Sequence, residues 1–335
     1  MAALLSIPAQ LPGQKGTLER VSVHGDSLEG NLSGDSPDRD VSIYLPPSYR
    51  ADAGRRYPAL YMLHGFTDSD EQWMGLEEHW INLTKLLDEE FGGGAKEMIV
   101  VMPNAFTRFH GSMYSASVTT GDWEGFIAEE LVAFVDARFK TIARREARGL
   151  AGHSMGGYGA LRIGMKRPEV FSSVYLLSPC CLSPRRGGPP GNGGGSPAEA
   201  IDSMEEFASA SFGVKALFAS AAAWAPNPAN PPFYLDLPYR GGEPRPEILA
   251  KFAANAPLAT LDQYVFNLRR LEALGFDAGD QDRGIAAAVR ELDERLTRYE
   301  IPHEFEIYEG DHTNRVDERI RRKTLPFFGE NLEFE

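Results

Sequence analysis

Cysteine is scarce in this sequence. The 335 residues include two cysteines, and they are neighbours, Cys180 and Cys181. Adjacent cysteines can form at best a strained disulfide, so a disulfide framework is excluded. Their spacing also differs from that of zinc ligands, so we expect two thiols at the end of a buried strand and no metal site.

Positive charge and long hydrophobic runs are also in short supply. Lys and Arg total 34 against 48 for Asp and Glu, which gives a formal net charge of −14. Such an acidic chain repels phosphate backbones and anionic membrane surfaces, so nucleic acid is not expected as a partner. No apolar run approaches the roughly 18 residues of a membrane-spanning helix, so no membrane span is expected.

The N-terminal residues 1–10 lack a basic segment, and their apolar run is too short for a complete signal peptide. This start fits the remnant of a signal peptide with Ala9 as the last residue removed. It fits an ordinary N-terminus equally well, so both interpretations stay open.

The hydrophobic pattern predicts a single α/β domain over residues 1–335. Alternating segments at 17–24 and 41–45 predict an antiparallel pair of strands at a sheet edge. Continuous apolar runs predict strands that are buried on both faces. They lie at 59–63, 98–102, 148–152 and 174–177, with later candidates at 274–278 and 304–308. Helical periodicity between these runs predicts a mostly parallel central sheet with helices on both faces.

The strongest motif is the run Gly152-His153-Ser154-Met155-Gly156. It follows an apolar strand and opens a helix, which is the context of the G-x-S-x-G nucleophile elbow. Glycines without a Cβ let chain segments pass close by, while backbone strain holds the serine hydroxyl outward. The helix N-terminus offers N–H groups to a developing oxyanion. Ser154 is therefore the predicted nucleophile.

A serine nucleophile needs a base, and the base needs a carboxylate that orients it. Among the seven histidines, His312 lies in a loop just after the last predicted strand, where an α/β-hydrolase presents its base. The acid should come from the loop after the preceding strand, which holds Asp280 and Asp282. Asp282 is favoured and Asp280 is the alternative, because Asp282 could instead cap the following helix.

The loop after strand 59–63 begins with His64, Gly65 and Phe66, and it should supply the second donor of an oxyanion hole. The predicted donors are the backbone N–H groups of Phe66 and Met155. Aromatic side chains near this site could stack on an aryl or sugar ester, or they could form the core of an insertion. The substrate-binding candidates are His64, Gly65, Tyr114, Trp224 and Phe233.

Residues 182–259 interrupt the alternation of strands and helices. The segment holds a glycine-rich run at 187–195, two Ala-rich helical pieces and the proline-rich stretch 226–232. It leaves the predicted strand 174–177, whose C-terminal end should lie beside Ser154. We therefore expect a mobile cap over the site, with Trp224 and Phe233 on its underside. A surface excursion that never reaches the site is the alternative.

Together these motifs resemble the esterase D-like branch of the α/β-hydrolases. That branch includes S-formylglutathione hydrolases, feruloyl and acetylxylan esterases, siderophore esterases and bacterial mycolyltransferases. The resemblance implies Asp282 as the triad acid, because residues 279–282 match the Gly-x-x-Asp loop of that family. The matching pieces are 41–47, 57–66, 102–104, 121–127, 152–157, 277–282 and 310–312.

The resemblance implies a serine carboxylesterase that works through an acyl-enzyme, on a small-molecule or carbohydrate-linked ester. An acyltransferase with the same triad is the alternative. A non-catalytic binding protein of the same fold is disfavoured, because no triad member is missing. This chemistry needs no cofactor. Related chains with a similar start favour a secreted or periplasmic location slightly, and self-association into a homo-oligomer is left open.

Overall fold

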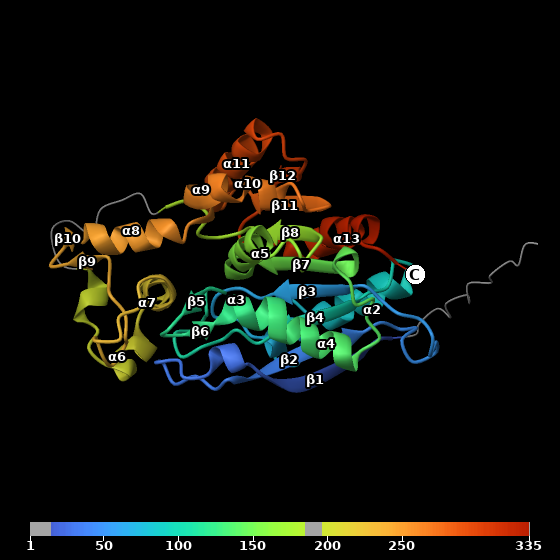
Figure 1. The fold of residues 1–335 in the computed structure, drawn as a ribbon, viewed down its shortest axis with the longest axis horizontal. Coiled ribbons are helices and arrows are strands. Elements are labelled where there is room, and N and C mark those ends of the chain that lie inside the picture. The colour runs from blue at the N-terminus through green and yellow to red at the C-terminus, as the bar shows by residue number, and fades with distance from the viewer. Residues whose placement is uncertain (1–14, 185–195, 335) are drawn as a thin grey trace, which may run out of the picture.

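The computed structural model describes residues 15–184 and 196–334 (Figure 1). The expectations about a signal peptide at 1–10 and about the glycine run at 187–195 fall outside the described residues. An eight-stranded sheet forms the centre, in the order β1-β2-β4-β3-β7-β8-β11-β12. These strands are β1 (Thr17–His24), β2 (Asp38–Leu45), β3 (Ala59–Leu63), β4 (Ile99–Pro103), β7 (Arg148–His153), β8 (Ser173–Leu177), β11 (Ala273–Gly279) and β12 (Glu304–Tyr308).

The sheet is mostly parallel with an antiparallel edge. β2 runs antiparallel to both β1 and β4, whereas β4, β3, β7, β8, β11 and β12 run parallel to one another. The predicted edge pair and parallel sheet are confirmed. Because the carboxyl ends of parallel strands meet at one edge, the loops after β3, β7, β11 and β12 gather there.

Helices cover both faces of the sheet, and alternate residues of each central strand face opposite layers. In β3, Tyr61 and Leu63 join one buried cluster, while Leu60 and Met62 join the other. The first cluster is covered by α3 (Trp123–Gly125), a π-helical segment (Phe126–Leu131), α4 (Val132–Arg138), α5 (Met155–Lys166) and α11 (Arg283–Arg298). The second is covered by α1 (Asp70–Met74), α2 (Leu83–Gly92), α12 (Val316–Arg319) and α13 (Leu325–Asn331).

The described part of the predicted insertion forms a helical cap at one end of the molecule, opposite the C-terminus (Figure 1). Its longest helix, α7, packs against the short strand β5 of a hairpin that precedes α3. The cap contains α6 (Met204–Ser209), α7 (Phe212–Trp224), β9 (Tyr239–Arg240), β10 (Glu243–Pro244), α8 (Pro246–Ala254) and the start of α9 (Pro257–Thr260). The hairpin consists of β5 (Ala116–Ser117) and β6 (Gly121–Asp122), and α10 (Val265–Leu268) follows the cap. None of the helices in the described ranges is long and apolar enough to span a membrane.

Candidate active site

Ser154 occupies a sharp turn between β7 and α5. Its backbone has φ 56° and ψ −113°, a conformation that residues with side chains rarely adopt. The turn is possible because the flanking glycines lack side chains. A Cβ on Gly152 would lie 2.3 Å from the backbone carbon of Gly156, and one on Gly156 would lie 2.0 Å from the carbonyl oxygen of Leu63. The packing thus accounts for both glycines of the motif.

The structure brings Ser154, His312 and Asp282 together in one hydrogen-bonded chain. His312 Nε2 lies 2.8 Å from Ser154 Oγ, and His312 Nδ1 lies 2.6 Å from Asp282 Oδ2. Because a carboxylate can only accept, Nδ1 carries the proton and Nε2 is free to accept the serine proton.

The neighbouring aspartate has a different partner. Asp280 Oδ1 accepts a 3.1 Å hydrogen bond from the backbone N–H of Gly310, in the loop that carries His312. Asp282 stands at the N-terminus of α11, but its side chain makes no capping hydrogen bond there. The geometry therefore puts Asp282 against the imidazole and leaves Asp280 to support the loop.

The two residues predicted to supply oxyanion donors both line the cavity at Ser154. Met155 is the first residue of α5, so its backbone N–H has no acceptor within the helix. Phe66 follows β3 across the gap. Between them lies Gly111, where a Cβ would be 2.7 Å from both Met155 Sδ and Phe66 Cδ2. The backbone at Gly111 thus packs closely against both side chains.

The cavity at Ser154 has a volume of about 340 Å³, and carbon and sulfur atoms make up most of its wall. Cys180 and Cys181 follow β8 and contribute to that wall, a position that the sequence did not reveal. The backbone N–H of Cys180 also donates a 3.1 Å hydrogen bond to the carbonyl oxygen of Ser154. The lining residues are Phe66, Met113, Ser154, Met155, Cys180, Cys181, Phe212, Ala216, Ser220, Asp282, Ile285 and His312.

His64 and Tyr114 lie beneath this wall, which corrects their predicted role in direct substrate binding. Both are fully buried. His64 Nε2 accepts the backbone N–H of Ala105 at 2.9 Å, and its Nδ1–H donates to the carbonyl oxygen of Gly65 at 2.9 Å. The Tyr114 hydroxyl donates to the carbonyl oxygen of His64 at 3.2 Å. Burial lowers the pKa of His64, so a neutral imidazole fixes the loop that presents Phe66.

Gly65, the third candidate of that loop, is a packing position. A Cβ there would lie 2.8 Å from Asp68 Oδ2 and 3.4 Å from His153 Nδ1. His153 is itself fully buried, and burial together with the nearby His312 lowers its pKa to about 4. The imidazole of His153 is therefore neutral near pH 7.

Trp224 and Phe233 also lie away from the cavity at Ser154. The Trp224 ring is buried between Tyr158 and Phe252, and its Nε1–H donates to Ser115 Oγ at 3.2 Å. Phe233 packs against other cap residues and lines a separate hollow. The cap does reach the site, but it does so through Phe212, Ala216 and Ser220.

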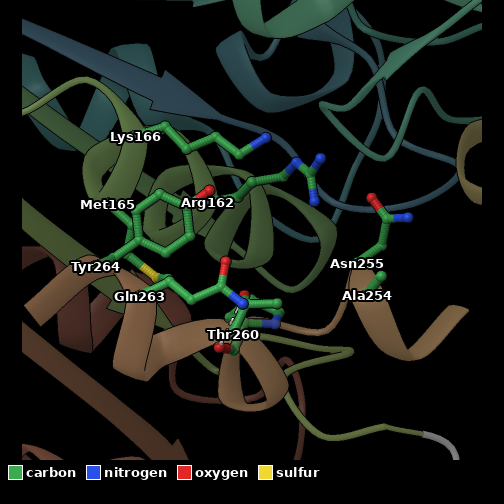
Figure 2. A pocket seen from close by; sticks show the side chains of 9 residues that line it. Arg162, Met165, Lys166, Ala254, Asn255, Thr260, Gln263 and Tyr264 are labelled. Carbon is green, nitrogen blue, oxygen red and sulfur yellow. Dashed lines mark hydrogen bonds between the residues drawn. The ribbon is translucent and has the colours of Figure 1, made fainter. Parts of the chain in front are cut away.

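Another cavity, of about 220 Å³, lies at the C-terminal half of α5 (Figure 2). Arg162 and Lys166 project along it from α5, and Asn255, Thr260 and Gln263 face them from the segment after α8. Ser154 begins the same helix at its other end. This cavity is therefore separate from the hydrogen-bonded chain at the nucleophile.

A comparison with known protein families shows which family the chain belongs to. The Esterase family profile matches residues 36–316. The chain belongs to this esterase family. An esterase of Mycobacterium tuberculosis (strain ATCC 25618 / H37Rv) is 34% identical over 139 residues, which are 40% of this chain and 27% of that protein.

An endo-1,4-beta-xylanase/feruloyl esterase of Xylanibacter ruminicola is 31% identical over 141 residues, which are 41% of this chain and 19% of that protein. The chain thus spans about a quarter or less of the length of these two relatives. A solved structure of a ferulic acid esterase superposes with a TM-score of 0.66, covering 95% of this chain and 99% of that chain at 19% identity. This likeness shows the α/β-hydrolase fold.

Proposed function

We propose that this member of the esterase family hydrolyses carboxylic esters through an acyl-enzyme intermediate. The observation that carries the proposal is the chain of hydrogen bonds from Asp282 through His312 to Ser154, which opens into an apolar cavity. Ser154 is the nucleophile, His312 is the general base and acid, and Asp282 orients the imidazole.

In the acylation step, Ser154 Oγ attacks the ester carbonyl carbon while His312 Nε2 takes the hydroxyl proton. The carbonyl oxygen becomes an oxyanion, and the backbone N–H groups of Phe66 and Met155 stabilise it. Asp282 favours the doubly protonated imidazole that forms. Collapse of the intermediate breaks the bond to the alcohol oxygen, which leaves with the proton returned by His312.

In the deacylation step, the oxygen of a water molecule attacks the acyl carbon on Ser154 while His312 takes a proton from that water. The second tetrahedral intermediate releases the carboxylic acid and restores the serine hydroxyl with the proton from His312. Water is the proposed acceptor rather than an alcohol, because the matched relatives are named esterases. The proposed substrates are small-molecule or carbohydrate-linked esters.

A labelling and turnover experiment tests this proposal. The purified chain is treated with a fluorophosphonate probe, and hydrolysis of p-nitrophenyl acetate and p-nitrophenyl butyrate is measured in parallel. We expect stoichiometric labelling at Ser154 together with turnover, and we expect S154A to lose both. A wild-type chain that neither takes the label nor hydrolyses either ester would overturn the proposal.

A further inference from the structure

One face of α7 forms a wall of the cavity at the nucleophile. Phe212, Ala216 and Ser220 recur every fourth residue, so they lie on the same side of the helix. The volume of about 340 Å³ is near the lower end of the roughly 300–1,000 Å³ range of small-molecule sites. A side chain that grows from this face of α7 therefore removes a large share of the space.

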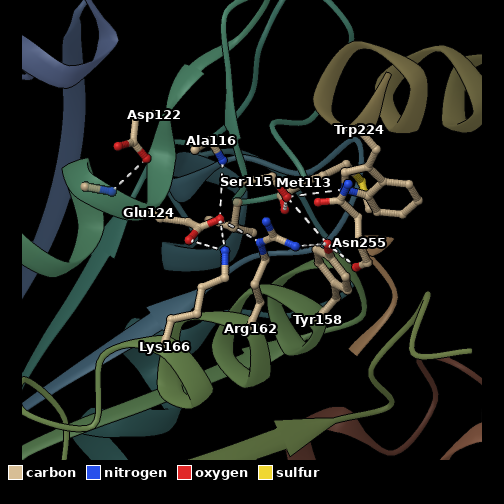
Figure 3. A network of polar contacts seen from close by, with 12 residues as sticks. Met113, Ser115, Ala116, Asp122, Glu124, Tyr158, Arg162, Lys166, Trp224 and Asn255 are labelled. Carbon is tan, nitrogen blue, oxygen red and sulfur yellow. Dashed lines mark hydrogen bonds and ion pairs between the residues drawn. The ribbon is translucent and has the colours of Figure 1, made fainter. Parts of the chain in front are cut away.

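The C-terminal end of α7 is anchored to the helix that carries the nucleophile (Figure 3). The Trp224 ring contacts the ring of Tyr158, with centroids 5.4 Å apart, and Tyr158 lies one turn after Ser154 on α5. The Tyr158 hydroxyl donates to the backbone carbonyl of Asn255 at 2.8 Å. This end of the cap is therefore held at a fixed distance from Ser154.

Ion pairs strengthen the same anchor (Figure 3). Glu124 accepts hydrogen bonds from Arg162 Nε at 2.6 Å and from Lys166 Nζ at 2.7 Å. Arg162 also donates to the Tyr158 hydroxyl at 3.2 Å. Ser117 Oγ, in β5, donates to the carbonyl oxygen of Ala222 at 2.6 Å. These contacts hold this end of the cap against α5 and β5.

The N-terminal end of α7 forms the mouth of the cavity. Phe212 is 67% exposed, and its ring meets the ring of Phe66 edge-on with centroids 5.5 Å apart. Phe66 is the proposed oxyanion donor from the loop after β3. The wall between the anchored end and the mouth consists of Ala216 and Ser220.

The chemistry of the lining selects against charge and polarity. Ser220 Oγ donates its hydrogen to the carbonyl oxygen of Ala216 at 2.8 Å, so it has no proton left for a ligand. Met113 and Met155 add thioethers, which are apolar and adapt in shape. Among the described lining residues, Asp282 supplies the one carboxylate and His312 the one imidazole, and these two groups already pair with each other. A charged acyl group would lose its hydration here without gaining a partner.

We propose that the α7 face of Phe212, Ala216 and Ser220 selects the acyl group, and that the site takes esters of uncharged, apolar acyl groups whose length is limited at Ala216. The inference rests on the proposed function and adds the substrate class of the same site. It places the limit on a helix that is fixed relative to Ser154, so added bulk at position 216 meets the acyl chain rather than displacing the cap.

The test is a series of p-nitrophenyl esters from acetate to decanoate, measured with the wild-type chain, A216L and A216F. We expect the kcat/KM of the longest accepted ester, relative to acetate, to fall by about tenfold or more in A216F, with A216L intermediate. The graded pair keeps the test valid if the larger side chain impairs folding. G213A is the matched control, since a Cβ there meets nothing within 4 Å, and its profile should equal that of the wild type.

A charged acyl group provides the second arm. We expect mono-p-nitrophenyl adipate to react at least tenfold more slowly than p-nitrophenyl heptanoate, the ester of a neutral acyl group of similar length, after the rate without enzyme is subtracted. An unchanged chain-length profile in folded A216L and A216F, or equal enzymatic rates for adipate and heptanoate, overturns the inference and leaves the proposed function standing. A chain without turnover and without labelling at Ser154 overturns the proposed function itself.

Discussion

The Nε2–H of His153 donates a 2.8 Å hydrogen bond to the backbone carbonyl oxygen of His312. The two rings also lie against each other, with centroids 4.7 Å apart. The residue before the nucleophile therefore holds the loop that carries the proposed base. In this arrangement His153 is neutral near pH 7, because burial and the nearby His312 lower its pKa to about 4.

Acid should destabilise the fold through His153. The unfolded imidazole titrates near 6.5 and the folded one near 4, so the unfolded chain binds the extra proton between these values. The stabilisation is complete above pH 6.5 and is lost as the pH falls to 4, by on the order of 3 kcal/mol. Denaturant unfolding at several pH values should show a flatter pH dependence for H153F than for the wild type. Parallel curves would assign the acid sensitivity to other groups.

Replacement of the nucleophile should abolish turnover and keep the fold. For S154A we expect kcat to fall on the order of 10⁴-fold or more, because residual catalysis comes only from substrate binding and the oxyanion donors. Circular dichroism and ester hydrolysis measured on the same preparation check this. A folded mutant with a tenth of the wild-type kcat would exclude Ser154 as the nucleophile.

The two aspartates of one loop should differ sharply in their effect. D282N replaces the acceptor 2.6 Å from His312 Nδ1 with an amide, which favours the wrong tautomer, so we expect kcat to fall roughly 10⁴-fold. D280N alters only the contact with the backbone N–H of Gly310 and should cost far less. Both variants are compared by kcat at one pH, and the reverse ranking would move the orienting role to Asp280.

A methyl group at Gly111 should disturb the proposed oxyanion hole. In G111A the new Cβ would lie 2.7 Å from an atom of Phe66 and 2.7 Å from an atom of Met155, so both side chains must shift. We expect kcat to fall about ten- to hundredfold, because displacements on the order of 1 Å misalign catalytic groups. G92A is the control, since its Cβ meets nothing within 4 Å. Equal kcat for G111A and G92A would show that Phe66 and Met155 accommodate the methyl group without moving the proposed oxyanion donors.

Removal of the Trp224 ring should act on stability. The side chain is an anchor of α7, so we expect W224A to lower the free energy of unfolding by about 3–5 kcal/mol. Denaturant unfolding measures this change. A mutant with wild-type stability and an altered chain-length profile would instead return Trp224 to the substrate pocket.

Much of the fold could be predicted because parallel strands that are buried on both faces appear in the sequence as continuous apolar runs. β3 and β12 begin and end where their apolar or alternating runs do, and β7 extends one residue beyond its prediction. The loops that carry Ser154 and His312 follow from these strands, since each side chain sits just beyond a strand end. The sequence favoured Asp282 but left Asp280 as an alternative, because both occupy one loop, and the coordinates put the Asp282 carboxylate against the imidazole.

The cap was harder to predict for a physical reason. α7 is apolar on nearly every side, so its sequence has no polar face to show which side meets the sheet and which the site. Trp224 and Phe233 were expected at the substrate because of their large rings, but large rings also stabilise the packing of a helix against its neighbours. The wall of the cavity falls instead to Ala216 and Ser220, whose small side chains give no signal in the sequence.

The C-terminal end of α7 is anchored and its N-terminal end forms the mouth of the cavity. The stability of the cap and the acyl preference therefore depend on different positions of one helix. Positions near Trp224 govern whether the cap stays in place, whereas Ala216 and Phe212, about two and three turns away, face the proposed acyl group. Substitutions at the N-terminal end of α7 can therefore change the acyl preference without weakening the contacts that hold the C-terminal end in place. The contact of Phe212 with Phe66 sets a limit on that freedom, because changes at the mouth are transmitted to the backbone that faces the reacting carbonyl.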